Sequence, residues 1–170
     1  MDAVLISPEL NRAFNEQIGR ELHASHQYIA IASYFEGRAL KKLAQLFFKQ
    51  SEEEREHAMK FVQYLNEVGG QVEIPTVESA SSNFRNAEEA VRLALEWELE
   101  VTRCINNLMT MAMEQKDYAA REFLDWFVKE QVEEVSTMND LYQIVRQVGE
   151  QYLIMVEAYL SHGGGEEEEE

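Results

Sequence analysis

Apolar residues recur every three or four positions along four long stretches of this chain, which is the period of a helix with one buried face. The stretches run from about Pro8 to Gly37, from about Arg38 to Val68, from about Asn86 to Asp117, and from about Tyr118 to Val148. Ser7 followed by Pro8 is typical of a helix start, and glycines follow the second and fourth stretches, where helices commonly end. The pattern therefore predicts four long helices.

The lengths of the connections predict how these helices are joined. Only a few residues separate the first helix from the second and the third from the fourth, so each pair should form an antiparallel hairpin. The 17 residues 69–85 between the hairpins have the composition of a loop. Such a segment spans roughly 55 Å when extended, which exceeds the roughly 45 Å length of a 30-residue helix. We therefore expect an all-α fold, an antiparallel four-helix bundle with one long crossover between helices two and three.

A shorter fifth segment, from Gln151 to Ser161, is apolar on almost every side. A helix of this kind has to be covered, and one subunit has little left with which to cover it. The segment therefore predicts a short fifth C-terminal helix and a homo-oligomer. The expected domain covers residues 1–162, and residues 163–170 form an acidic tail that we expect to be disordered.

Polar residues interrupt the buried face of each predicted helix near its middle. The interruptions are Glu21 on the first helix, Glu54 and His57 on the second, Glu98 on the third, and Gln131 and Glu134 on the fourth. Each lies at a similar distance from the nearer hairpin turn, so the six side chains should converge at one level of the bundle. The spacing also repeats, because 33 residues separate Glu21 from Glu54 and Glu98 from Gln131. This repeat indicates internal pseudo-two-fold symmetry.

Four buried carboxylates need an explanation, because each unpaired one costs several kcal/mol, roughly. The buried faces of the predicted helices carry no lysine or arginine, so the carboxylates are either protonated or neutralised by cations. Two divalent ions balance four carboxylates. Oxygen ligands with one imidazole suit iron or manganese better than a structural zinc, which prefers sulfur and nitrogen. The pattern favours a dinuclear metal centre.

Composition narrows the classes of function. The chain has 32 acidic and 15 basic residues and a net charge of −17, which repels nucleic-acid backbones, so we expect no nucleic-acid partner. The single cysteine, Cys104, excludes an internal disulfide and suits a reducing compartment. No apolar run approaches the roughly 18 residues of a membrane span, and the first residues lack a signal-peptide pattern. The chain is expected to be cytoplasmic, with no membrane association.

Several motifs resemble those of non-haem bacterial ferritins, and of actinobacterial-type ferritins in particular. The motifs are NEQIGRELHASHQY, QSEEEREHAM, VEIPTVES, WELEVTRCIN and FLDWFVKEQVEEV, and the resemblance runs from about Asn11 to His162. It implies a hollow shell of 24 subunits, with the fifth helix lining the four-fold axes. The implied activity is that of a ferroxidase, which oxidises Fe(II) with O2 or peroxide so that iron is stored as a ferric mineral.

The resemblance also implies a role for each interrupting residue. The first iron would be bound by Glu21, Glu54 and His57, and the second by Glu54 as a bridge, Glu98 and Glu134, with Gln131 beside it. Gln131 stands where related di-iron proteins have a charged or imidazole ligand, so the second position should be weaker. Our hypothesis is that iron there is a substrate passing through rather than a retained cofactor.

Further residues match functional positions of the resembled family. Glu53, Glu130 and Glu133 match a third, transient iron site, and Tyr28 and Trp126 match aromatic residues near the centre. From its place in the pattern alone, Tyr28 is either a core aromatic or a donor of an electron or a hydrogen bond to bound oxygen. No haem is expected, because Arg55 stands where bacterioferritins carry the haem-ligating methionine.

Two other functions remain open from the sequence. One is a di-iron or di-manganese oxidoreductase that retains its metal and acts on peroxide or an organic substrate. The other is a small DNA-protecting cage like Dps, which the apolar fifth segment and the absence of a basic tail disfavour. Asp117 and Glu122, near the start of the fourth helix, are candidates for an iron entry channel.

Overall fold

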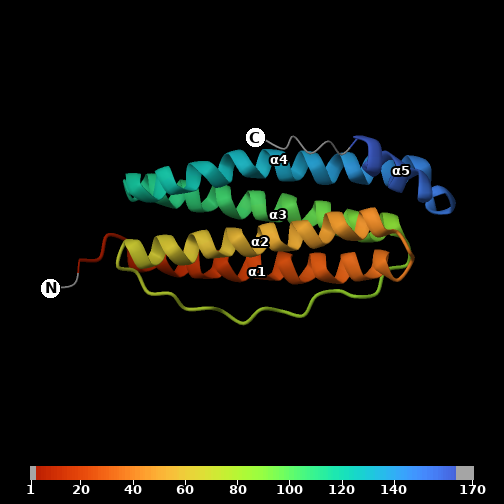
Figure 1. The fold of residues 1–170 in the computed structure, drawn as a ribbon. Coiled ribbons are helices and arrows are strands. Elements are labelled where there is room, and N and C mark those ends of the chain that lie inside the picture. Colours follow the sequence, from red (N-terminus) through yellow and green to blue (C-terminus); the bar gives the residue numbers. More distant parts are fainter. Residues whose placement is uncertain (1–2, 164–170) are drawn as a thin grey trace.

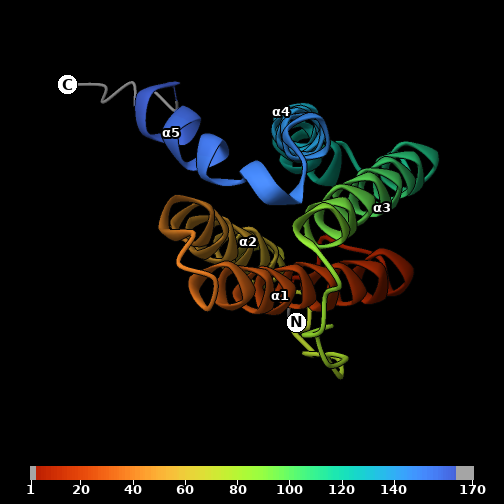
Figure 2. The ribbon, with the colours of Figure 1, turned by 90° about the vertical axis from the view of Figure 1, so that its right-hand side faces the viewer.

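The computed structural model describes residues 3–163, and these residues form helices and no strands. The long helices are α1 (Pro8–Glu36), α2 (Lys41–Glu67), α3 (Ala87–Glu114) and α4 (Tyr118–Val148). A 3-10 turn at Glu150–Tyr152 and the short helix α5 (Ile154–Gly163) follow. α1 lies along α2 and α3 along α4, and the two hairpins pack into a four-helix bundle (Figure 1; Figure 2). The expected all-α fold is confirmed.

The ends of the helices follow from local hydrogen bonds. Ser7 caps α1, because its hydroxyl accepts the amide of Leu10 at 3.0 Å, and Asp117 caps α4 through the amide of Ala120 at 2.9 Å. α2 begins at Lys41, later than the predicted start near Arg38, because the chain turns through residues 37–40 and Ala39 has a positive φ of 60°. The fifth segment is also broken into a 3-10 turn and a helix, where one continuous segment was predicted.

The crossover, residues 68–86, runs along the outside of α1 for the length of the bundle (Figure 1). Side-chain amides of α1 hold it, because Asn11, Asn15 and Gln27 each both donate to and accept from the crossover backbone. Gly19 permits a close approach here, since a Cβ at this position would lie 2.5 Å from Cγ of Pro75. The crossover is therefore fixed to α1 at both of its ends.

The apolar core is divided into two clusters along the bundle. One contains Tyr28, Phe35, Phe47, Met138 and their neighbours, and the other contains Phe14, Phe61, Leu108, Phe127 and theirs. On every long helix the two clusters are separated by a gap in the apolar pattern. The gap contains the buried polar residues Glu21, Glu54, Glu98 and Glu134. The fold therefore encloses one polar layer at mid-bundle.

The C-terminal segment is attached to the bundle by two carboxylates that cap other helices. Glu157 of α5 accepts the amide of Lys42 at 2.7 Å at the start of α2, which has no capping side chain of its own. Glu150 accepts the amide of Ala87 at 3.0 Å at the start of α3. α5 leaves Ile154 and other large apolar side chains exposed in the single chain. The predicted disorder of the acidic tail concerns residues that lie mostly outside those described.

In the described part of the chain, no helix combines the length and the apolar character that crossing a membrane requires.

Candidate metal centre

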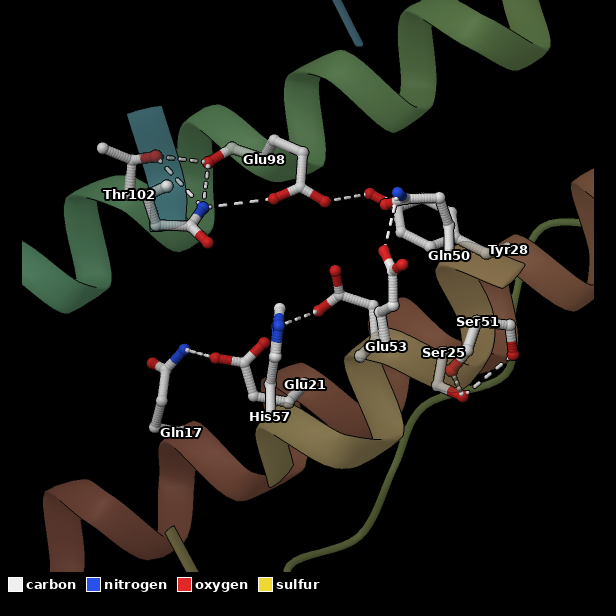
Figure 3. A network of polar contacts seen from close by, with 12 residues as sticks. Gln17, Glu21, Ser25, Tyr28, Gln50, Ser51, Glu53, His57, Glu98 and Thr102 are labelled. Carbon is white, nitrogen blue, oxygen red and sulfur yellow. Dashed lines mark hydrogen bonds and ion pairs between the residues drawn. The ribbon is translucent and has the colours of Figure 1, made fainter. Parts of the chain in front are cut away.

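The six residues that interrupt the predicted apolar faces all lie in the polar layer between the two core clusters. Their side chains are buried, with exposed fractions of 5% or less. They come from all four long helices, and several of them are drawn with their neighbours in Figure 3. The residues are Glu21, Glu54, His57, Glu98, Gln131 and Glu134.

Two overlapping sets of three side chains can each hold a metal ion. In the first set, one ligand atom each from Glu21, Glu54 and His57 lies within 4.8 Å of the others, and in the second set the same holds for Glu54, Glu98 and Glu134. Glu54 belongs to both sets. A carboxylate has two oxygens, so Glu54 is placed to contact two ions at once. The two sets could therefore hold two ions that share one carboxylate.

The first set is oriented by one amide and by aromatic rings. Gln17 donates from Nε2 to Oε1 of Glu21 at 2.8 Å (Figure 3). Nδ1 of His57 lies 3.4 Å from Oε2 of Glu54. The imidazole also meets the ring of Trp126 edge to face at a centroid distance of 5.4 Å. These contacts limit the rotation of both the carboxylate and the imidazole.

The second set is oriented by hydrogen bonds to Glu98. The hydroxyl of Tyr28 donates to Oε1 of Glu98, and Gln131 donates from Nε2 to Oε2 at 3.1 Å. Nε2 of Gln131 also contacts Oγ1 of Thr102 at 3.2 Å, and that hydroxyl donates to the backbone carbonyl of Glu98 at 2.8 Å. Both oxygens of Glu98 therefore have protein donors.

Burial and mutual repulsion raise the pKa values of the acids. Burial is the larger cause for Glu21 and Glu54, whose pKa values lie well above the usual range, and neighbouring carboxylates add to it. Burial, followed by the charge of Glu98, raises the pKa of Glu134 to about 8. The pKa of Tyr28 is also raised, by burial and by Glu98, so this phenol stays protonated and remains a donor. Without cations the layer favours protonated acids.

Two of the buried oxygens that lack a partner among the described residues belong to the first ligand set, which tests the fit to a metal ion. They are Oε2 of Glu21 and Oε1 of Glu54. Buried polar atoms are normally satisfied, so unpartnered oxygens inside a ligand set suggest that an ion completes them. Carboxylate oxygens with one imidazole form the donor set that suits iron or manganese. The residues present fit such ions.

The predicted third-site residues are brought together only in part. Glu130 is half-buried and joins His57 and Glu134 in a further set of possible ligands. Glu53 is half-buried and accepts a 2.9 Å hydrogen bond from Gln50. Glu133 is exposed and belongs to none of the ligand sets found among the described residues.

Some residues that contact the acids of the polar layer were not predicted as site residues, and one candidate for an entry channel has a structural role. Gln17 and Gln50 lie on the buried faces near the acids, and that position was the signal that would have found them. For Thr102, the only indication in the sequence was its position one helical turn after Glu98. Asp117, a candidate for an entry channel, caps α4.

Comparisons with known proteins point to one family. The family described as "Ferritin-like domain" matches residues 11–148. The ferritin BfrB of Mycolicibacterium smegmatis is 41% identical over 144 residues, which cover 85% of this chain and 80% of that protein. A bacterial non-heme ferritin of Staphylococcus haemolyticus is 34% identical over 146 residues, which cover 86% and 88%. An open pore ferritin from the archaeon Archaeoglobus fulgidus superposes with a TM-score of 0.89 at 36% identity, over 93% of this chain and 98% of that chain.

Proposed function

This chain belongs to the bacterial ferritin family, and we propose that it oxidises Fe(II) at the mid-bundle site and stores the product as ferric mineral. The observation that carries the proposal is the pair of buried ligand sets that share Glu54 and contain unpartnered oxygens. Iron is the substrate and cargo of this reaction. The oxidant is O2 or peroxide.

The proposed ligands follow the two sets. Glu21, Glu54 and His57 hold the first Fe(II), and Glu54, Glu98 and Glu134 hold the second. Gln131 lies beside the second position and is uncharged, which weakens the hold on iron there. The bound ion therefore leaves after oxidation, as a substrate does.

The electrons and protons of the reaction balance at such a site. Two Fe(II) ions give up one electron each, and O2 takes up two electrons and two protons to become H2O2, or H2O2 becomes two molecules of water. Binding of iron displaces protons from acids whose pKa values are raised, such as Glu21 and Glu134, so protons become available where they are consumed. The four helices contribute proximity of the two ions and a fixed charge balance.

Tyr28 is proposed as part of this site through its hydrogen bond to Glu98. Its ring packs against Phe47 in the core, and its hydroxyl stays protonated next to the carboxylate. The phenol therefore holds Glu98 in one orientation.

A transient third iron is proposed to bind on the α2 and α4 side of the centre. Glu130 supports this, because it shares a ligand set with His57 and Glu134. Glu53 lies on α2 and Glu133 on α4, the two helices of this proposed site.

The wider proposal is a cytoplasmic homo-oligomer, a cage of 24 subunits without haem or nucleic acid. The exposed apolar side chains of α5, Ile154, Met155 and Tyr159, support contacts between subunits. The net charge of −17 supports the exclusion of nucleic acids.

Replacement of Glu54 or His57 by alanine tests the proposed reaction. Each change removes a ligand, so rapid oxidation of added Fe(II) should be lost, measured by absorbance of Fe(III) and oxygen uptake. Helical content by circular dichroism should stay near that of the parent. Glu52→Ala is the matched control, because Glu52 is an exposed glutamate on the same helix.

Unchanged oxidation in both ligand variants would contradict the proposed site. Protein purified without added iron that retains two irons per chain, as a dimer without mineral, would instead favour an oxidoreductase with a resident metal cofactor. Size-exclusion chromatography and metal analysis distinguish these outcomes.

A further inference from the structure

We propose that Thr102 is a positioning residue for the second iron position, because it fixes the side-chain amide of Gln131 with its nitrogen toward Glu98 and its oxygen free to bind metal. This inference rests on the proposed function. It assigns a task to a residue that is neither an acid nor a histidine.

Three acceptor atoms surround Nε2 of Gln131. They are Oε2 of Glu98 at 3.1 Å, Oγ1 of Thr102 at 3.2 Å, and the backbone oxygen of Glu98 at 3.3 Å. An amide NH2 can donate two hydrogens, so this nitrogen is fully engaged on the α3 side. None of the hydrogen bonds found among residues 3–163 uses the amide oxygen of Gln131.

Thr102 contributes an acceptor because its own hydrogen is committed elsewhere. Its hydroxyl donates to the backbone oxygen of Glu98 at 2.8 Å, one helical turn earlier (Figure 3). Only the lone pairs of Oγ1 then face Gln131. The hydroxyl therefore accepts from Nε2.

The reverse orientation of the amide is disfavoured by the same atoms. A flipped Gln131 would bring its oxygen against the carboxylate and the backbone carbonyl of Glu98. Both are acceptors when Glu98 is ionised, so the contact would be repulsive. The network around Thr102 thus sets which atom of the amide faces away from α3.

The orientation matters for iron because only one end of an amide is a metal ligand. Hard cations bind side-chain amide oxygens, and the amide nitrogen has no available lone pair. With Nε2 held by Glu98 and Thr102, Gln131 can offer its neutral oxygen to an ion without turning. The same contacts hold Oε2 of Glu98, a proposed ligand of the second iron. Thr102 therefore acts on two neighbours of that position and on none of the first.

Replacement of the hydroxyl provides the test, in the full-length assembled protein. Thr102→Val keeps the shape and removes the hydroxyl, and Thr102→Ser keeps the hydroxyl. Anaerobic titration with Fe(II), followed by calorimetry, should show affinity at the second position lowered about 10-fold in Thr102→Val, as is common when a partner of a metal ligand is lost. The first position should keep its affinity, and Thr102→Ser should bind both ions like the parent.

The chain offers a matched control on the same helix. Thr110 makes the same one-turn hydrogen bond, to the backbone oxygen of Asn106 at 3.1 Å, but it is exposed and lies away from the polar layer. Thr110→Val should bind both ions like the parent. Thr102→Val added to Gln131→Ala should have no further effect, because Thr102 acts through that amide.

Three results overturn the inference. They are a second-site affinity in Thr102→Val equal to that of the parent, an equal loss in Thr102→Ser, or a full additional loss in the Gln131→Ala background. Thr102→Ala repeats the test if the valine variant does not assemble. A parent protein that binds fewer than two Fe(II) per chain would instead refute the proposed function itself, so the two failures are distinguishable.

Discussion

The acids of the polar layer should make the metal-free protein less stable as the pH rises, and Glu134 allows the effect to be isolated. Its carboxyl titrates near 4.5 in an unfolded chain, whereas burial and the charge of Glu98 raise its pKa to about 8 in the folded chain. Between these values the folded state holds a proton that the unfolded state has lost. The free energy of unfolding therefore falls as pH rises from 4.5 to 8, and there is no penalty below that window.

The size of the effect follows from the two pKa values. Ionisation of Glu134 lowers the free energy of unfolding by at most about 5 kcal/mol above pH 8 and by at most roughly 3 kcal/mol at pH 7. The titratable groups that face Glu134 are Glu98 on α3, Glu53, Glu54 and His57 on α2, and Glu130 on α4. Removing the charge at Glu134 also lessens the repulsion at Glu54. Glu134→Gln should therefore be more stable than the parent without metal.

Thermal unfolding of metal-free protein at pH 5, 7 and 8 measures this. At pH 7 the variant should melt above the parent, by at most roughly 6–12 °C, since about 1 kcal/mol corresponds to 2–4 °C in a chain of this size. At pH 5 the two should melt close together, and added Fe(II) under anaerobic conditions should reverse the order at pH 7. A parent whose stability stays level from pH 5 to pH 8, or a variant with the same pH dependence, would refute the reasoning.

Two further predictions concern the fold that holds the site. Gly19→Ala should destabilise the protein by about 1–3 kcal/mol, because its Cβ would collide with Pro75 of the crossover. Gly37→Ala makes only ordinary contacts and should be neutral. Melting temperatures and protease cleavage within residues 68–86 measure the effect, and an unaffected Gly19→Ala would show that the crossover moves aside at little cost. Glu157→Ala should lower the free energy of unfolding by about 0.5–2 kcal/mol through loss of the α2 cap. Glu157→Gln keeps an acceptor and should lower it less. Denaturant unfolding tests this, and equal losses of stability in the two variants would show that the cap is not the cause.

The fold was predictable because its determinants are local or repeat along the chain. The helices follow from apolar residues at helical spacing, and Ser7 and Asp117 cap helices within three residues of themselves. The length of the crossover shows that it can span the bundle, whereas its path along α1 depends on the side-chain amides of that helix. The start of α2 was missed, because the turn before it depends on a positive φ at Ala39, a conformation that alanine rarely adopts.

The placement of the acids was also predictable, because a carboxylate on an otherwise apolar helix face has to enter the core. How far each side chain reaches into the polar layer could not be predicted. Glu130 and Glu133 both match the third-site pattern, yet Glu130 is half-buried in a ligand set and Glu133 is exposed. Three residues turn a helix by about 300°, which leaves two such neighbours only about 60° apart, so a small difference in the rotation of α4 decides which of them reaches the layer and which stays exposed at its edge.

The sequence by itself determined that four helices pair as two hairpins and that their acids meet at one level, because periodicity and spacing are properties of the chain. Only the tertiary structure decided how the acids are held. The bond from Tyr28 to Glu98 joins α1 to α3, the contact of Gln131 with Thr102 joins α4 to α3, and Glu157 of α5 caps α2. Such contacts depend on the distance and rotation between packed helices, which are set by the shapes of side chains meeting in the core.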